Sequence, residues 1–136
     1  MKKIKSVFVV DDDPINNVIC KTLISTLNFS EEIHCFVKAD DALQYLQNPQ
    51  NTLPDIIFLD INMPEIDGWG FLERFEQLPN SIVNTCLVYM LSSSINRDDI
   101  GRAKNNRLVQ DYIQKPLSPV SLEEVKRQYA LARQNS

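Results

Sequence analysis

The feature that most constrains this chain is the alternation of short apolar runs with stretches of helical periodicity. Each run is rich in Val, Ile and Phe and only a few residues long, which is typical of a buried strand. The runs cover Ser6–Val10 and residues 33–37, 55–59, 85–91 and 109–113. Strands that alternate with helices predict an α/β fold, a doubly wound five-stranded parallel sheet with helices on both faces.

Five stretches have the spacing of helices. The first begins at Asp13 and Pro14, which is typical of an N-cap followed by the first helical position. An apolar stripe at spacings of three and four predicts that it is amphipathic, with Asn16 and Asn17 off the stripe. The stripe consists of Ile15, Val18, Ile19, Thr22, Leu23, Thr26 and Leu27.

The other four predicted helices have less regular sequence signals. One starts at Ala39, one is expected at residues 68–78 and one covers Pro119–Arg133. The pattern at residues 96–104 is weaker, because Gly101 lowers helix propensity.

Length and charge limit the class of protein. A chain of 136 residues predicts a single domain, residues 1–136, without an output domain. A net charge of −4 and the lack of a long basic cluster argue against nucleic acid as a partner. The apolar runs are too short to span a membrane, and no signal peptide is evident. Cys20, Cys35 and Cys86 lack metal-type spacing, which favours reduced, mostly buried thiols in a cytoplasmic protein.

Polar residues follow four of the five predicted strands. Asp11 and Asp12 end the first strand, Asp60 the third and Ser92 the fourth, and Lys115 lies close to the end of the fifth. In open parallel sheets, ligands bind outside the carboxyl ends of the strands. These residue types on one edge therefore predict a functional site there.

The triplet of Asp11, Asp12 and Asp13 needs a compensating interaction. At ~5 Å and an effective dielectric of ~20, each pair of like charges costs roughly 3 kcal/mol before screening by salt. Two interpretations are open, a bound cation and a solvated helix cap. Asp13, which is followed by Pro14, fits the cap.

The chain resembles the CheY-like receiver domains of two-component response regulators. The resemblance lies in "VFVVDDD", "PDIIFLDINMPEIDGWGFL", "YMLSS" and "YIQKPLS", and it runs through essentially the whole chain. It implies the strand order 2-1-3-4-5. The "DINMPEIDG" block is the most specific of these motifs.

The resemblance also implies roles for individual residues. Asp60 would accept a phosphoryl group, with Lys115 and Ser92 contacting it, and Ser92 and Tyr112 would form the switch. Asp12 and Asp60 would bind Mg²⁺ directly, Asn62 through its backbone carbonyl and Asp11 mainly through water. Oxygen ligands of this kind suit Mg²⁺.

The implied function is a signalling module rather than an enzyme, one that catalyses only its own phosphorylation and dephosphorylation. Its partners would be a sensor histidine kinase or histidine phosphotransfer protein and a downstream protein target, with no nucleic acid and no membrane. A receiver that is never phosphorylated remains an alternative, although every required residue is present.

Two alternatives of another class meet specific obstacles. A small aspartyl-phosphate phosphatase or phosphotransferase needs a second acid two residues after its nucleophile, and Asn62 at that position cannot act as a general acid. A flavodoxin-like flavin protein needs a phosphate-binding loop after the first strand, where the carboxylates of "DDDPINN" would repel a phosphate.

Local chemistry gives further expectations. Pro64 and Gly68 frame the loop after Asp60, with Gly68 permitting a positive φ. The resemblance implies a cis bond before Pro116 that directs Lys115 into the site. Leu108 and Val109 stand where many receivers have Gly-Ala, so the fourth predicted helix and the output face are expected to differ in shape.

Overall fold

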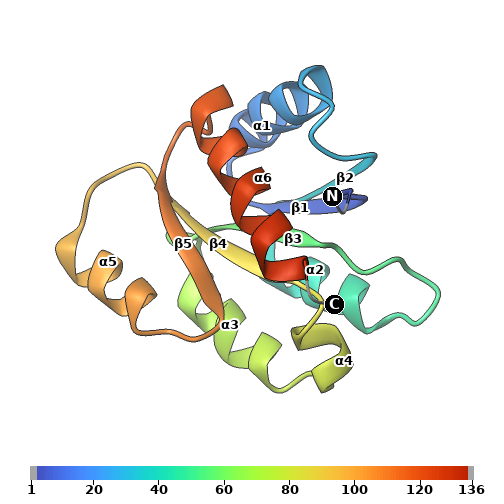
Figure 1. The fold of residues 1–136 in the computed structure, drawn as a ribbon. Helices are drawn as coiled ribbons and strands as arrows, with labels where there is room; N and C mark the ends of the chain where they lie inside the picture. The colour runs from blue at the N-terminus through green and yellow to red at the C-terminus, as the bar shows by residue number, and fades with distance from the viewer. Residues whose placement is uncertain (1–2, 135–136) are drawn as a thin grey trace.

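The computed structural model describes residues 3–134, and its five strands form one sheet in which neighbours are parallel. The strand order β2-β1-β3-β4-β5 confirms the expected fold class and the implied order (Figure 1). The ends of the strands lie within one or two residues of the predicted ones. The strands are β1 (Ser6–Val10), β2 (Glu32–Phe36), β3 (Ile56–Asp60), β4 (Leu87–Ser92) and β5 (Val109–Gln114).

Helices cover both faces of the sheet, as predicted (Figure 1). One face carries α1 (Pro14–Thr26) and α6 (Pro119–Arg133). The other face carries α2 (Ala39–Gln47), α3 (Gly68–Glu76), α4 (Asn80–Val83) and α5 (Arg97–Lys104). The sequence did not predict α4, because a helix of four residues is too short to show a period.

The two faces of the sheet form two separate cores. Along β1, Phe8 and Val10 pack beneath α2 and α3, whereas Val7 and Val9 pack beneath α1 and α6. This alternation is the normal period of a strand. Every residue of β1 and β3 is buried, so the strand that precedes Asp11 and the strand that ends in Asp60 lie at the centre of the fold.

The apolar stripe predicted for α1 faces solvent rather than the core. The helix itself is confirmed, and the Asp13 carboxylate caps it by accepting a hydrogen bond from the backbone N–H of Ile15. The buried residues are Asn17, Cys20 and Ile24, whereas the stripe is largely exposed, with Ile15 at 71%. The helix carries apolar residues on two faces, and periodicity alone does not say which one packs on the sheet.

Two further observations concern the cysteines and the possibility of a membrane-spanning helix. Cys20 and Cys86 are buried free thiols, whereas Cys35 is exposed. Within the described part of the chain, no helix combines the length and the apolar character needed to cross a membrane.

Candidate functional site at the carboxyl edge of the sheet

The structure brings three carboxylates from two adjacent strands to one point at the carboxyl edge. Asp11 and Asp12 follow β1, and Asp60 is the last residue of β3, which pairs with β1. One oxygen of each carboxylate lies within 4.8 Å of the others. Asp11 and Asp60 are buried, whereas Asp12 is exposed, so the cluster opens to solvent at Asp12.

Lys115 supplies a positive charge to this cluster. Its Nζ lies 2.6 Å from Asp11 Oδ2 and 3.1 Å from Asp60 Oδ1, and its side chain is only 16% exposed. Burial lowers the pKa of Lys115, but hydrogen bonding to Asp11 and the charges of Asp60 and Asp11 outweigh this, so the net pKa is raised. Lys115 is therefore held as an ammonium against both carboxylates.

Two backbone features fix the position of Lys115. The peptide bond between Lys115 and Pro116 is cis, as the resemblance implied. The backbone N–H of Lys115 also donates a hydrogen bond to the carbonyl of Ser92, 2.7 Å away. The loop after β5 is thus tied to the end of β4.

Asp60 has an unusual affinity for protons. Burial, together with the negative charge of Asp11, raises its pKa to about 6, although Lys115 and a backbone hydrogen bond from Asn62 act in the opposite direction. Without a metal, Asp60 therefore ionises less readily than a solvent-exposed aspartate. A divalent cation would stabilise this ionised form.

The donor set fits a hard cation. The three carboxylates offer only oxygen, and their summed charge exceeds the single charge of Lys115. Mg²⁺ is commonly held by one or two carboxylates and keeps several waters. Asp12 and Asp60 could act as ligands, whereas both carboxylate oxygens of Asp11 already accept hydrogen bonds from protein donors.

The loop after Asp60 differs from the expectation in one respect. The residue with positive φ is Glu65, at 66°, and no described glycine has a positive φ. Gly68 is instead required by close packing, because a Cβ at this position would lie 2.7 Å from the Asp60 carbonyl oxygen and 2.9 Å from Ile61 Cα. Gly68 lets the start of α3 pass directly against the end of β3.

The two predicted switch residues are linked through the backbone of one residue, Ser94. Ser92 is fully buried, and its Oγ accepts a hydrogen bond from the backbone N–H of Ser94 at 3.3 Å. The Tyr112 hydroxyl donates to the carbonyl of the same Ser94 at 2.8 Å. Tyr112 lies on β5 and is partly buried against the core on the face of the sheet that carries α2 to α5.

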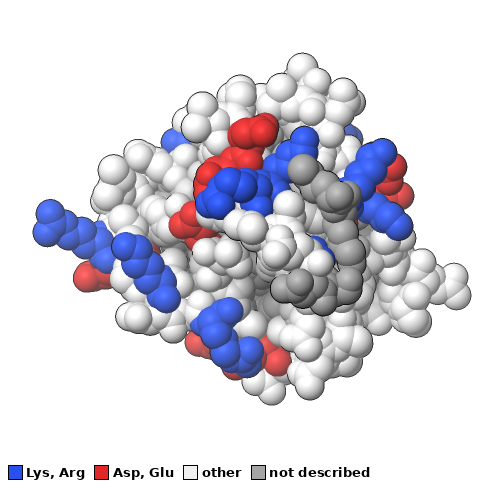
Figure 2. Space-filling view, in the orientation of Figure 1, with Lys and Arg blue, Asp and Glu red and all other residues white. Residues whose placement is uncertain are grey.

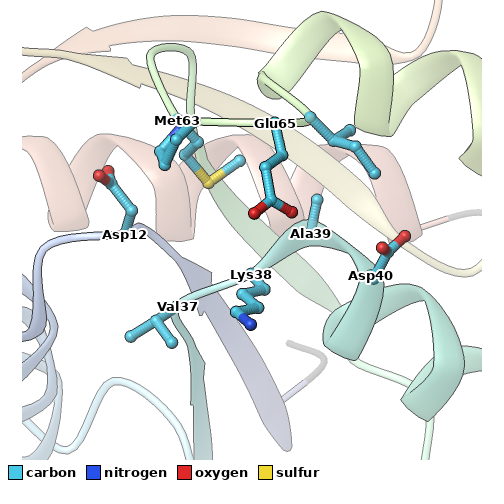
Figure 3. A pocket seen from close by; sticks show the side chains of 9 residues that line it. Asp12, Val37, Lys38, Ala39, Asp40, Met63 and Glu65 are labelled. Carbon is cyan, nitrogen blue, oxygen red and sulfur yellow. The ribbon is translucent and has the colours of Figure 1, made fainter.

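A cavity of about 260 Å³ adjoins the cluster through Asp12 (Figure 3). It lies between the turn from β2 to α2 and the loop after β3. Glu65 reaches over it toward Ala39, and Lys38 lines its floor (Figure 3). The cavity leaves room for a bulky group to approach Asp12 from outside.

Sequence reasoning missed two residues of the site, both on α1. The side-chain amide of Asn16 donates to Asp11 Oδ2 at 2.6 Å, and that of Asn17 donates to the Asp11 carbonyl at 2.9 Å. The available signal was the pair of amides in the first turn after the carboxylates. Asn17 is 5% exposed, which is unusual for an amide without a structural role.

Known proteins are similar to this chain along most of its length. Residues 7–127 match the response regulator receiver domain family. A crystal structure of a two component response regulator from Cytophaga hutchinsonii is 32% identical, with 96% of this chain and 99% of that chain covered and a TM-score of 0.89. A response regulator receiver protein from Dyadobacter fermentans is 25% identical, with 92% and 97% covered and a TM-score of 0.83. An uncharacterised 14.6 kDa protein of Leptolyngbya boryana is 28% identical over 93% of this chain and 90% of that protein.

Proposed function

The chain belongs to the response regulator receiver domain family, the phosphoacceptor modules of two-component signalling, and from this membership we propose that Asp60 accepts the phosphoryl group. The donor is a phosphohistidine on a sensor histidine kinase or a histidine phosphotransfer protein. The observation that carries this proposal is the position of the Asp60 carboxylate, buried at the sheet edge beside the Lys115 ammonium and the other two carboxylates.

The transfer forms one bond and breaks another. An oxygen of ionised Asp60 attacks phosphorus, the bond from phosphorus to the imidazole nitrogen breaks, and its electron pair stays on the imidazole. The Lys115 ammonium, 3.1 Å from Asp60 in the resting protein, turns to the phosphoryl oxygens and stabilises their charge. Ser92, at the end of the neighbouring strand, supplies a hydroxyl donor to the same group.

We propose that Mg²⁺ binds at Asp12 and Asp60, with the backbone carbonyl of Asn62 as a further ligand and Asp11 acting through water. When bound, Mg²⁺ neutralises charge that spreads over the transferring oxygens. The support is the oxygen-only donor set and its excess of negative charge. Asp11 stays outside the ligand set because its carboxylate already accepts hydrogen bonds from protein donors.

The module acts on no substrate other than its own aspartate. Catalysis is limited to phosphorylation and dephosphorylation of Asp60. The alternative, a phosphatase or phosphotransferase for other substrates, lacks support because the position two residues after Asp60 holds Asn62. The output is a change in protein–protein contacts, made through Ser92 and Tyr112.

The exposed apolar residues of α1 provide a surface for the phosphodonor protein. Ile15 is 71% exposed and Val18 64%, and they follow the carboxylate cluster directly along the chain. Val120, in the first turn of α6 after Lys115, is 79% exposed. The surface over α1, at the top of the view in Figure 2, carries few charged side chains. A donor that covers this surface places its phosphohistidine at the opening beside Asp12.

The direct test is phosphorylation by a small donor. The protein is incubated with Mg²⁺ and acetyl phosphate, and intact mass is followed over time. We expect the gain of one phosphoryl group by the wild type and none by Asp60→Asn, which is nearly isosteric and leaves the fold intact. A labile phosphoryl group on the Asp60→Asn variant would assign the acceptor to another carboxylate.

A further inference from the structure

Asn16 has no part in the reaction described above, yet it makes one of the shortest contacts in the site. Its side-chain nitrogen is 2.6 Å from Asp11 Oδ2, and the Lys115 ammonium is 2.6 Å from the same oxygen. The other oxygen, Oδ1, accepts the backbone N–H of Asp13 at 2.9 Å. Asp11 is fully buried, so these donors replace water for its carboxylate.

The two donors on Oδ2 differ in what else they must do. Lys115 also contacts Asp60, and under the proposed function it turns to the phosphoryl oxygens. When Lys115 leaves, Asp11 Oδ2 loses its only contact with a cationic side chain among the described residues. A buried charged oxygen that loses its hydrogen-bond donors is strongly destabilised.

Asn16 has no competing task at the phosphoryl group. It belongs to the first turn of α1, which is anchored by the Asp13 cap and by the hydrogen bond from Asn17 to the Asp11 carbonyl. Its nitrogen also lies 3.6 Å from the sulfur of buried Cys20, so the side chain is held between the helix and the carboxylate. The amide is neutral, and it adds no positive charge that would oppose a divalent cation nearby.

We propose that Asn16 is a positioning residue for phosphoryl transfer. It holds the Asp11 carboxylate while Lys115 moves from Asp11 to the phosphoryl group on Asp60. This inference rests on the proposed function, since it assigns Asn16 a part in the same reaction. It also explains why an amide follows the carboxylates at this position of α1.

The test is a double-mutant cycle on the rate of phosphorylation. Asn16→Leu keeps the shape of the side chain and removes the donor, and Lys115→Ala removes the group that has to move. The rate of mass gain with acetyl phosphate at saturating Mg²⁺ is measured in the wild type, both single variants and the double variant. Thr22→Val, an exposed and nearly isosteric change on the same helix, serves as the control.

We expect Asn16→Leu to slow phosphorylation by about 10-fold or more, as for the loss of a hydrogen bond to a charged group. In the Lys115→Ala background the same substitution should change the rate less than about twofold, because no ammonium has to leave Asp11. The control should match the wild type. Affinity for beryllofluoride, a phosphoryl mimic, is measured in all variants as a second readout and should follow the same pattern.

Two results would overturn the inference. If Asn16→Leu has the wild-type rate of phosphorylation and the wild-type affinity for beryllofluoride, the Asn16 amide makes no contribution to phosphoryl transfer. An equal fold-change in both backgrounds, matched by a lower melting temperature, would show a structural role only. If the wild type itself gains no phosphoryl group, the proposed function fails instead, so the two failures are distinguishable.

Discussion

The Tyr112 hydroxyl and the carbonyl of Ser94 are joined by a hydrogen bond of 2.8 Å. Because the N–H of Ser94 in turn bonds to Ser92 Oγ, the loop after β4 connects the proposed phosphorylation site with a ring on β5. If Ser92 moves toward a phosphoryl group on Asp60, this link loosens. The Tyr112 ring can then turn inward into the space that Ser92 leaves.

This connection predicts the behaviour of Ser92→Ala. The variant should still accept a phosphoryl group at Asp60 but lose most of the conformational response, because a hydrogen bond to a charged acceptor is worth about 1.5–3 kcal/mol, or roughly 10- to 150-fold in population. The order of the Tyr112 ring is followed by NMR with and without beryllofluoride. Ser93→Ala, at an exposed neighbour, is the control and should respond as the wild type does. A wild-type change in Tyr112 ring order in Ser92→Ala would show that the conformational response does not depend on Ser92.

Crowding of the carboxylates predicts the response to Mg²⁺. At a concentration of about 100 times its Kd, Mg²⁺ should stabilise the wild type by ~2.7 kcal/mol, which raises the melting temperature. Asp12→Asn should stabilise the metal-free protein through reduced repulsion and abolish most of the Mg²⁺ response. Asp13→Asn is the matched control, since asparagine also caps helices and Asp13 lies outside the cluster. An unchanged response in Asp12→Asn would exclude Asp12 as a ligand.

The exposed face of α1 predicts a difference between protein and small-molecule donors. Ile15→Ser should lower the rate of transfer from a phosphorylated histidine phosphotransfer protein by about 10-fold, the effect of one moderately important interface residue. The rate with acetyl phosphate should stay at the wild-type value, because the small donor needs no protein surface. Leu131→Ser, on an exposed residue near the end of α6, is the control. Equal slowing with both donors would indicate damage to the site rather than to the surface.

Residue patterns in the sequence predicted most of the architecture. The apolar strand runs and the polar residues at their ends were enough to locate the site. This is because the carboxyl ends of parallel strands meet at one edge of the sheet, independently of the loop conformations. The orientation of α1 could not be predicted, since Ile15 and Ile24 are equally apolar and only packing on the sheet separates an exposed residue from a buried one. The role of Asn16 depends on the side-chain geometry around Asp11, which spacing does not encode.

The reason for a glycine at position 68 also depends on tertiary packing and could not be predicted from the sequence. A glycine after a loop suggests a positive φ, whereas the structure needs it for close approach to β3. Gly68→Ala should therefore lower the free energy of unfolding, by roughly 1–3 kcal/mol, because its Cβ meets backbone atoms that cannot move freely. Gly101→Ala should do the opposite and stabilise by up to about 1 kcal/mol, since the added Cβ would meet no atom within 4 Å apart from the nearby backbone of its own helix. Urea unfolding of both variants measures the difference, and similar values for the two would refute it.

The raised pKa of Asp60 predicts how stability depends on pH in the metal-free protein. Below pH ~4 the carboxyl group is protonated in the folded and the unfolded chain. Between pH ~4 and about 6 the folded protein keeps a proton that the unfolded chain has released, so the free energy of unfolding falls as the pH rises. Above about pH 6 both states are ionised and the loss is complete, at up to ~3 kcal/mol.

Asp60→Asn cannot titrate at this position, so the stability that it gains over the wild type should grow between pH ~4 and about 6 and then stay constant. Urea unfolding in EDTA, measured for both proteins at half-unit steps of pH, gives this difference directly. Saturating Mg²⁺ should flatten the wild-type profile, because a cation favours the ionised carboxylate and lowers its pKa. Parallel profiles of wild type and variant in EDTA would show that Asp60 ionises as readily in the folded protein as in the unfolded chain. Its burial beside Asp11 would then carry no electrostatic cost for a cation to relieve.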